Sequence, residues 1–217
     1  MVRTYKKGVI FDLDGTLIDS TGKLARDVSE TYARLGVDVS PEYSKGRDWE
    51  SLAEELGVDY KVFWEEFCRR KTWEESLASG EVGLFPDTIS SLEALSSAGV
   101  PLSLVTKSTL EDTQTKLYHF DLWKYFSAVE PVSPREESKL DGMLDMIDFI
   151  GDFFTPMKKV YLVGDSRGDV DLTDKITFFT NIPSEGIYVN RNGEVLEGYE
   201  SVQNLTQVKE IILGNGR

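Results

Sequence analysis

The chain has 217 residues, of which 40% are hydrophobic, so it is long enough to fold around a sizeable core with a smaller second domain. Its 24 basic and 38 acidic residues give a formal net charge of -14. This acidic balance argues against non-specific binding to nucleic acid or to an anionic membrane, both of which need a basic surface.

The first predicted element is the strand GVIF (8–11), which is followed at once by Asp12 and Asp14. If the chain stays extended, positions i and i+2 point the same way, so the two carboxylates share one small space and repel each other. A bound cation, a shared proton or water must offset that repulsion. Which of these applies decides the chemistry of this strand end.

Residues 20–84 are predicted to form an all-helical insertion directly after the first strand. Apolar residues recur there at helical spacing, and we expect its aromatic residues to form a small core. The apolar stripes are Leu24, Val28, Tyr32 and Leu35, then Trp49, Leu52 and Leu56, and then Phe63, Phe67, Trp73 and Leu77.

From residue 85 onward, predicted strands and helices alternate, which is the pattern of an α/β fold with a parallel sheet. The strand candidates are short apolar runs without strict alternation, as expected when both faces of the sheet are covered. These runs are LSLVT (102–106), VYLVG (160–164), ITFF (176–179) and IYV (187–189). Apolar stripes predict helices around residues 89–95, 140–150 and 205–212. Thr109 followed by Asp112 resembles a capping box at the start of a further helix.

Polar side chains stand where three of these strands end. Asp12 and Asp14 follow the first strand, Thr106 ends the second, and Asp165 follows the third, with Asp169 four residues later in GDSRGD. Ligands bind at the carboxyl ends of the strands in an open parallel sheet. We therefore expect four carboxylates and a hydroxyl to converge at this edge.

The carboxylate cluster predicts a magnesium site. Several acids in one cleft raise the pKa of one another unless a cation intervenes. Oxygen ligands with no histidine or cysteine nearby favour Mg²⁺ over zinc, and Mg²⁺ held by few carboxylates usually works together with a substrate phosphate. Lys139, near the start of the helix before the third strand end, adds an ammonium group. One of Asp12 and Asp14 can then be nucleophile and metal ligand, and the other general acid and base.

These residues resemble the four ordered motifs of the haloacid dehalogenase (HAD) superfamily of phosphohydrolases. The residues that carry the resemblance are DLDGT (12–16), Thr106, Lys139 and GDSRGD (164–169). The helical insertion after the first motif and the segment FPDTISSLEALSSAGVPLSLVTKS are also similar to that family, in particular to its members of the phosphoglycolate phosphatase and β-phosphoglucomutase type.

The resemblance implies a Rossmann-like α/β core made of residues 1–19 and 85–217, with a parallel sheet, and a small all-helical cap made of residues 20–84. A cap of this kind closes over the site and selects the substrate. Lys45 and Arg47 lie in the segment SPEYSKGRDWE and are candidates for contacting the substrate. The alternative, which we favour, is a solvated basic loop.

The resemblance also implies roles in catalysis. Asp12 attacks phosphorus and forms an aspartyl-phosphate, while Asp14 protonates the leaving oxygen and then activates water. Mg²⁺ is held by the Asp12 carboxylate, the Asp14 backbone carbonyl and Asp165. Asp169 supports the metal shell or orients Lys139.

Thr106 and Lys139 are expected to hold the phosphoryl oxygens, which suits a transfer that depends on neutralised charge and in-line positioning. The third motif of the family often reads Lys-Pro, but here it is Lys139-Leu140. Lys107 and Lys158 are therefore alternatives for this lysine, and Lys107, a further candidate for substrate binding, is expected to face away.

We expect a Mg²⁺-dependent phosphatase that hydrolyses a small phosphorylated metabolite through an aspartyl-phosphate. A sugar-phosphate mutase of the same fold keeps every motif, so the sequence leaves it open. A 2-haloacid dehalogenase is disfavoured by Asp14, because a halide needs no protonation. A non-catalytic scaffold that binds metal or phosphate is disfavoured because it has no need for both Asp12 and Asp14.

Other features have ordinary explanations. Cys68, the single cysteine, cannot form an internal disulfide, and the apolar run after the basic start MVRTYKKG is too short for a signal peptide. We therefore expect a soluble cytoplasmic protein, either a monomer or a homodimer, with Cys68 packed inside the insertion. His119 is assigned to the surface, Asp171 and Asp174 to solvated helix positions, and Arg135–Glu137 to a solvated loop.

Overall fold

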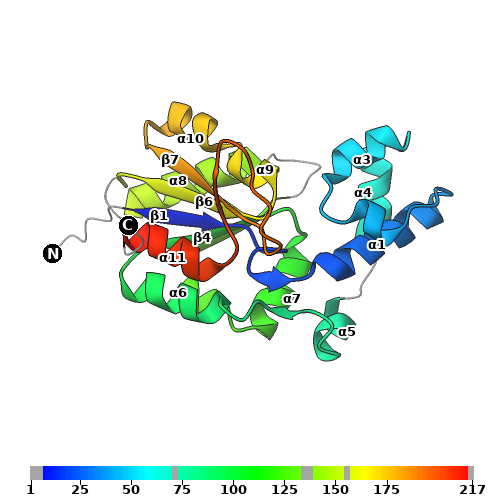
Figure 1. The fold of residues 1–217 in the computed structure, drawn as a ribbon, viewed down its shortest axis with the longest axis horizontal. Helices are drawn as coiled ribbons and strands as arrows, with labels where there is room; N and C mark the ends of the chain where they lie inside the picture. Colours follow the sequence, from blue (N-terminus) through cyan, green and yellow to red (C-terminus); the bar gives the residue numbers. More distant parts are fainter. Residues whose placement is uncertain (1–6, 70–72, 133–138, 154–156, 215–217) are drawn as a thin grey trace. The chain divides into compact units, whose positions relative to one another are not determined.

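The structure is a computed structural model that describes residues 7–69, 73–132, 139–153 and 157–214. For residues 149–153 it describes the backbone alone. Its residues group by proximity into two compact units. The first consists of residues 1–18 and 84–217, and the second of residues 19–83. Figure 1 shows the first unit as a sheet with helices on both faces and the second as a group of helices.

The first unit is built on a six-stranded sheet of order β5-β4-β1-β6-β7-β8, in which every neighbouring pair is parallel. Its strands are β1 (Gly8–Phe11), β4 (Leu102–Thr106), β5 (Ala128–Pro131), β6 (Val160–Gly164), β7 (Ser184–Val189) and β8 (Glu200–Val202). The predicted α/β class is confirmed. The apolar runs that end in Asp12, Thr106 and Asp165 are neighbouring strands, with β1 between β4 and β6.

Helices connect these strands and cover both faces of the sheet. They are α6 (Thr88–Ser97), α7 (Leu110–His119), the 3-10 turn η1 (Trp123–Tyr125), α8 (Lys139–Phe153), α9 (Arg167–Val170), α10 (Thr173–Thr180) and α11 (Leu205–Leu213). The helix α11 packs on α6 and α10 packs on α8, and these two pairs lie on opposite faces of the sheet in Figure 1.

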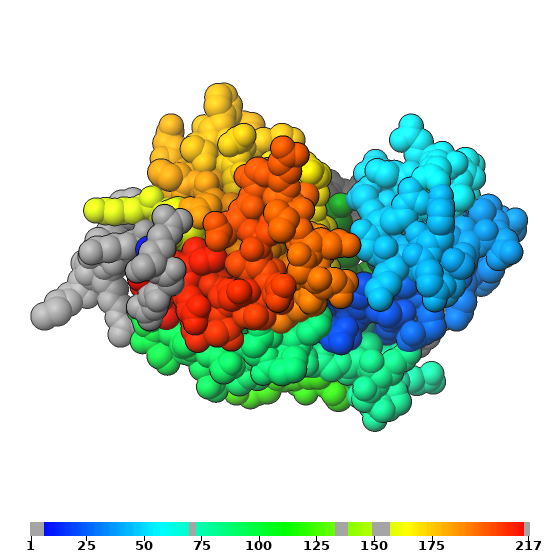
Figure 2. All heavy atoms as spheres, in the orientation of Figure 1, coloured from blue at the N-terminus to red at the C-terminus, as the bar shows by residue number. Residues whose placement is uncertain are grey.

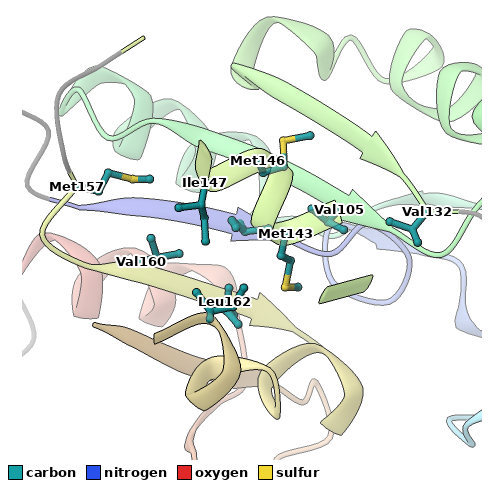
Figure 3. Close-up of a cluster of buried hydrophobic side chains, with 10 residues drawn as sticks. Val105, Val132, Met143, Met146, Ile147, Met157, Val160 and Leu162 are labelled. Carbon is teal, nitrogen blue, oxygen red and sulfur yellow. The ribbon is translucent and has the colours of Figure 1, made fainter. Parts of the chain in front are cut away.

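The core under α8 shows why that helix sits on the sheet. Met143, Met146 and Ile147 lie on the buried face of α8, because they are spaced at three and four residues along the helix. They pack against strand residues that include Val105 and Leu162, as Figure 3 shows. This packing fixes the first residue of α8, Lys139, close to the sheet edge.

The prediction of a strand at ITFF (176–179) is wrong, because these residues belong to α10. A run of four apolar residues cannot by itself distinguish a strand from a helix. Ile176 is buried, while Phe178 and Phe179 are exposed, which is the pattern of a helix with one face on the protein. The atoms of α10, gold in Figure 2, lie at the surface of the first unit.

The second unit is helical. Its helices are α1 (Thr21–Arg34), α2 (Pro41–Ser44), α3 (Trp49–Glu55), α4 (Tyr60–Cys68) and α5 (Trp73–Ala78). Its small core includes Val28, Tyr32, Leu52 and Phe63, and the rings of Tyr32 and Phe63 stack with their centroids 4.7 Å apart. Cys68 was expected to pack inside this unit, and that prediction is wrong because its side chain is exposed near the end of α4.

The chain passes from one unit to the other twice, and the two segments in which it does so pair with each other. The short strands β2 (Ile18–Asp19) and β3 (Gly83–Leu84) form a two-stranded sheet at that point. Among the described residues, no helix is both long enough and apolar enough to cross a membrane.

Candidate active site

The candidate site lies at the carboxyl edge of the sheet, where β4, β1 and β6 end side by side. Asp12 follows β1, and its backbone N–H donates to the Val163 carbonyl of β6 at 2.9 Å. Thr106 is the last residue of β4 and is buried. Asp165 follows β6 directly. The parallel register of these strands therefore places three sequence-predicted residues at one edge.

Three carboxylates gather there. Asp12, Asp165 and Asp169 each offer one oxygen, and these oxygens lie within 4.8 Å of one another. Asp169 is brought in by α9, where it closes a capping box: the backbone N–H and the hydroxyl of Ser166 donate to its Oδ2 at 3.0 and 2.6 Å. Asp169 is therefore fixed by the turn that follows β6.

Two glycines let the chain pass close to these carboxylates. A Cβ at Gly15 would overlap the carboxylate of Asp165, and Gly15 also has a φ of 81°, which favours glycine. A Cβ at Gly164 would overlap the side chain of Asp169. The glycines of DLDGT and GDSRGD are thus needed for the close approach of the two loops.

Lys139 is the lysine that contacts the cluster. Its Nζ donates to Asp12 Oδ1 at 2.6 Å and also to Asp169, and the side chain is buried. Lys107 and Lys158, the alternatives left open by the sequence, are exposed. The geometry favours Lys139 for the third motif in spite of the leucine that follows it.

Burial and mutual repulsion shape the electrostatics of the cluster. Burial is the largest of the effects that together raise the pKa of Asp12 to about 7; the Asp169 carboxylate also raises this pKa, and Lys139 lowers it. The pKa of Asp165 is raised well above its ordinary value by burial and by Asp12 and Asp169. Burial alone would lower the pKa of Lys139, but the carboxylates of Asp12 and Asp169 outweigh it and raise that pKa.

This donor set fits a hard divalent cation. The three clustered side chains offer only carboxylate oxygens, which Mg²⁺ and similar ions prefer. A cation among them would offset the repulsion that raises the pKa values of Asp12 and Asp165. The cluster can therefore hold a divalent metal.

The sequence did not predict the role of Lys116. This residue of α7 is fully buried, and its Nζ donates to Asp14 Oδ2 at 2.5 Å and to the Ser108 hydroxyl at 3.1 Å. A lysine in a helix is usually solvated, so the residue type does not predict that Lys116 is buried. The available signal was position, since Thr113 and Leu117 put Lys116 on the buried face of α7.

The sequence also did not predict the role of Arg191, which follows β7. Its Nη1 donates to both carboxylate oxygens of Asp87 at 2.9 and 3.0 Å, and its Nη2 donates to the Thr16 carbonyl at 3.0 Å. The guanidinium lies over the Phe85 ring, 3.9 Å from the centroid. Arg191 thereby ties the loop that carries Asp14 to the start of α6.

The two candidates for substrate contact outside the motifs belong to the second unit. Lys45 is exposed. Arg47 pairs with Glu55 and lies over the Tyr43 ring, 4.6 Å from its centroid. Both contacts are internal to the second unit, so the contact of Lys45 and Arg47 with a substrate stays a prediction.

The remaining assignments concern ordinary surface residues. His119, Asp171 and Asp174 are exposed, in agreement with the sequence analysis. The segment Arg135–Glu137 lies outside the described residues.

Comparison with known proteins shows what this arrangement is similar to. A family model described as haloacid dehalogenase-like hydrolase matches residues 9–178. Phosphoglycolate phosphatase of Escherichia coli (strain K12) is 29% identical, with 88% of this chain and 85% of that protein covered. The phosphoglycolate phosphatase of Escherichia coli O157:H7 is 30% identical over the same shares.

Solved structures share the fold. A predicted phosphatase from Clostridium acetobutylicum matches with a TM-score of 0.73 and 21% identity, covering 98% of this chain and 100% of that one. A HAD phosphatase from Thermococcus onnurineus matches with a TM-score of 0.61 and 23% identity, covering 95% and 97%.

Proposed function

This chain belongs to the haloacid dehalogenase-like hydrolase family, as its motifs predicted, and it is a hydrolase of the phosphatase type; we propose that it hydrolyses a small phosphate monoester with Mg²⁺, through an aspartyl-phosphate on Asp12. The observation that carries the proposal is the buried Asp12 carboxylate, which contacts Lys139 and adjoins two further carboxylates. Phosphoglycolate is the first candidate substrate, because the two Escherichia coli relatives compared above are phosphoglycolate phosphatases.

Asp12 is suited to be the nucleophile. Its carboxylate would attack phosphorus while the bond from phosphorus to the leaving oxygen breaks. Lys139 donates to Asp12 Oδ1 and so reduces the repulsion between this carboxylate and an incoming phosphate. Thr106, at the end of the neighbouring strand, would donate its hydroxyl to a phosphoryl oxygen.

The carboxylates of Asp12 and Asp165 and the backbone carbonyl of Asp14 would hold the metal. Asp169 contacts Ser166 and Lys139, so it would support the metal shell and orient that lysine. When bound, Mg²⁺ supplies positive charge that neutralises the phosphoryl oxygens. Lys139 supplies the fixed positive charge of the protein at the same place.

Asp14 would serve as general acid and then as general base. It would give a proton to the leaving oxygen as that oxygen departs, and take a proton from the water that attacks the aspartyl-phosphate. The side chain of Asp14 is partly exposed, which suits a group that must meet both a leaving group and water.

We further propose that the second unit, residues 19–83, is a cap that selects the substrate and limits the access of water. A sugar-phosphate mutase would use the same residues in the first unit. The two activities differ in whether the phosphoryl group ends on water or on a sugar, so an assay that follows both inorganic phosphate and sugar-phosphate isomers distinguishes them.

The test is release of inorganic phosphate from phosphoglycolate, other small phosphate esters and p-nitrophenyl phosphate, with Mg²⁺ and with a chelator. We expect release that depends on Mg²⁺ and is lost in Asp12→Asn, about 10³-fold or more, because the nucleophile is gone. Asp171→Asn, at an exposed aspartate, is the matched control and should keep its activity. Undiminished release by Asp12→Asn would contradict the proposed mechanism.

A further inference from the structure

Lys116 is a fully buried ammonium to which the mechanism above gives no task. It contacts Asp14, the proposed acid and base, whereas the ammonium of Lys139 serves Asp12 and Asp169. The two lysines come from different helices, α7 and α8. Each of the two acids that follow β1 therefore has its own lysine.

The free energy of burying the ion pair between Lys116 and Asp14 does not suggest a purely structural role. Removing an ammonium from water is costly, and a buried ion pair often contributes no more stability than apolar residues of the same size. The position lies among the buried residues Thr113 and Leu117 of α7, where an apolar side chain would pack without that cost. The pair therefore calls for an explanation other than stability.

The ammonium is held in place independently of Asp14. Its second partner is the hydroxyl of Ser108, which is buried just beyond the end of β4. The helix that carries Lys116 is capped by Thr109, whose hydroxyl accepts from the Asp112 backbone N–H at 3.1 Å. Ser108 and the capped start of α7 thus fix the position of the nitrogen that Asp14 contacts.

We propose that Lys116 is a positioning residue that holds the Asp14 carboxylate in the orientation required for its two proton transfers. The proposal rests on the proposed phosphatase function. Asp14 is partly exposed, so without an anchor its side chain would sample several rotamers. The contact through Oδ2 restricts that freedom, and proton transfer depends steeply on such geometry.

This role predicts a dependence on the leaving group. An alkyl ester needs a proton on its oxygen as the bond to phosphorus breaks, whereas p-nitrophenolate leaves without one. Loss of Lys116 should therefore slow phosphoryl transfer from an alkyl ester and spare transfer from p-nitrophenyl phosphate. The second step, attack of water on the aspartyl-phosphate, also uses Asp14 and should slow for both substrates.

The experiment compares the wild type with Lys116→Met in rapid-mixing kinetics with Mg²⁺. With p-nitrophenyl phosphate we expect a normal burst of p-nitrophenol followed by turnover slowed about 100-fold, in the range of a lost acid–base contribution. With an alkyl ester such as phosphoglycolate we expect slow transfer and no burst. Lys124→Met, at an exposed lysine that pairs with Asp121, is the matched control and should behave as the wild type.

The outcomes separate the two proposals. If the wild type releases no phosphate from any ester, the proposed function fails. If the wild type is active and Lys116→Met slows the first step equally for both esters, or slows neither step, the positioning role is wrong. Ser108→Ala removes the second partner of the Lys116 ammonium. It should slow the first step for the alkyl ester more than for p-nitrophenyl phosphate, by a smaller factor than Lys116→Met. This variant keeps the proposal testable even if Lys116→Met does not fold.

Discussion

At the scale of single residues, the two acids after β1 contact two different lysines. Asp12 contacts Lys139, and Asp14 contacts Lys116. The turn at Gly15, with its positive φ, ends the extended chain just after the second acid. Separate lysines therefore reduce the repulsion that the spacing of the acids predicts, and Asp12 also belongs to the carboxylate cluster that could hold a metal.

The raised pKa values of the cluster predict how stability changes with pH. Burial raises the pKa of Asp12 from 3.8 to about 7, and the pKa of Asp165 is also raised. At a pH between the two pKa values of Asp12, the folded protein binds more protons than the unfolded chain. The stability that protonated Asp12 contributes is therefore present at low pH and is lost as the pH rises through about 7. The melting temperature of the metal-free protein should therefore fall over this range.

The measurement is a pair of thermal unfolding series, for the wild type and for Asp12→Asn, both without metal. The variant should gain stability relative to the wild type as the pH rises, because it has no carboxylate to ionise at that position. Mg²⁺ should raise the melting temperature of the wild type most at the highest pH of the series. A difference between the two proteins that does not change with pH would contradict this account.

How much of the site could be predicted depends on how local its signals are. Asp12 and Asp165 directly follow apolar strands, and Asp169 stands in the same short motif as Asp165. The sequence alone was therefore enough to predict that the three residues meet at one edge of the sheet. Lys116 and Arg191 could not be found in this way. Their partners are 102 and 104 residues away in the chain, and only the packed fold brings them together.

At the scale of elements, Arg191 connects the loop after β1 to the residue that precedes α6. It binds the carboxylate of Asp87, which precedes α6, and the carbonyl of Thr16. Asp87 also accepts from the backbone N–H of Leu205, the first residue of α11. The loop that carries Asp14 is thus braced against α6 and α11 through one arginine.

Arg191→Met should therefore destabilise the protein by about 1–3 kcal/mol, because it leaves the Asp87 carboxylate and the Thr16 carbonyl without this donor. Urea unfolding measures the effect. Arg167→Met, at an exposed arginine 3.8 Å from Asp171, is the control and should cost at most about 1 kcal/mol. Equal effects of the two substitutions would show that the Arg191 contacts do not stabilise the fold.

The helices could be predicted where the apolar pattern extends over several turns. The apolar stripe over residues 140–150 spans about three helical turns and predicted α8. The four residues ITFF carry no such period and were assigned to the wrong class. The strand β5 was not predicted, because Glu130 and Pro131 make half of its four residues unlike a buried run.

At the scale of the whole molecule, an acidic protein is proposed to act on an anionic substrate. The formal net charge is -14, so long-range attraction does not favour phosphate. The positive charge is local: it comes from the ammonium of Lys139 and from the metal that the carboxylates can hold. The second unit has its own core, and we propose that as a cap it governs which phosphate ester is accepted.

The central claim is that phosphate passes through a covalent bond to Asp12, and the most direct measurement is to trap that bond. Asp14→Asn should transfer phosphate from p-nitrophenyl phosphate, which needs no acid, and then stall because it cannot activate water. After acid quenching, we expect mass spectrometry to find one phosphoryl group on the peptide that contains Asp12, with Mg²⁺ and not with chelator. Continued release of p-nitrophenol with no phosphoryl group on Asp12 would contradict the account.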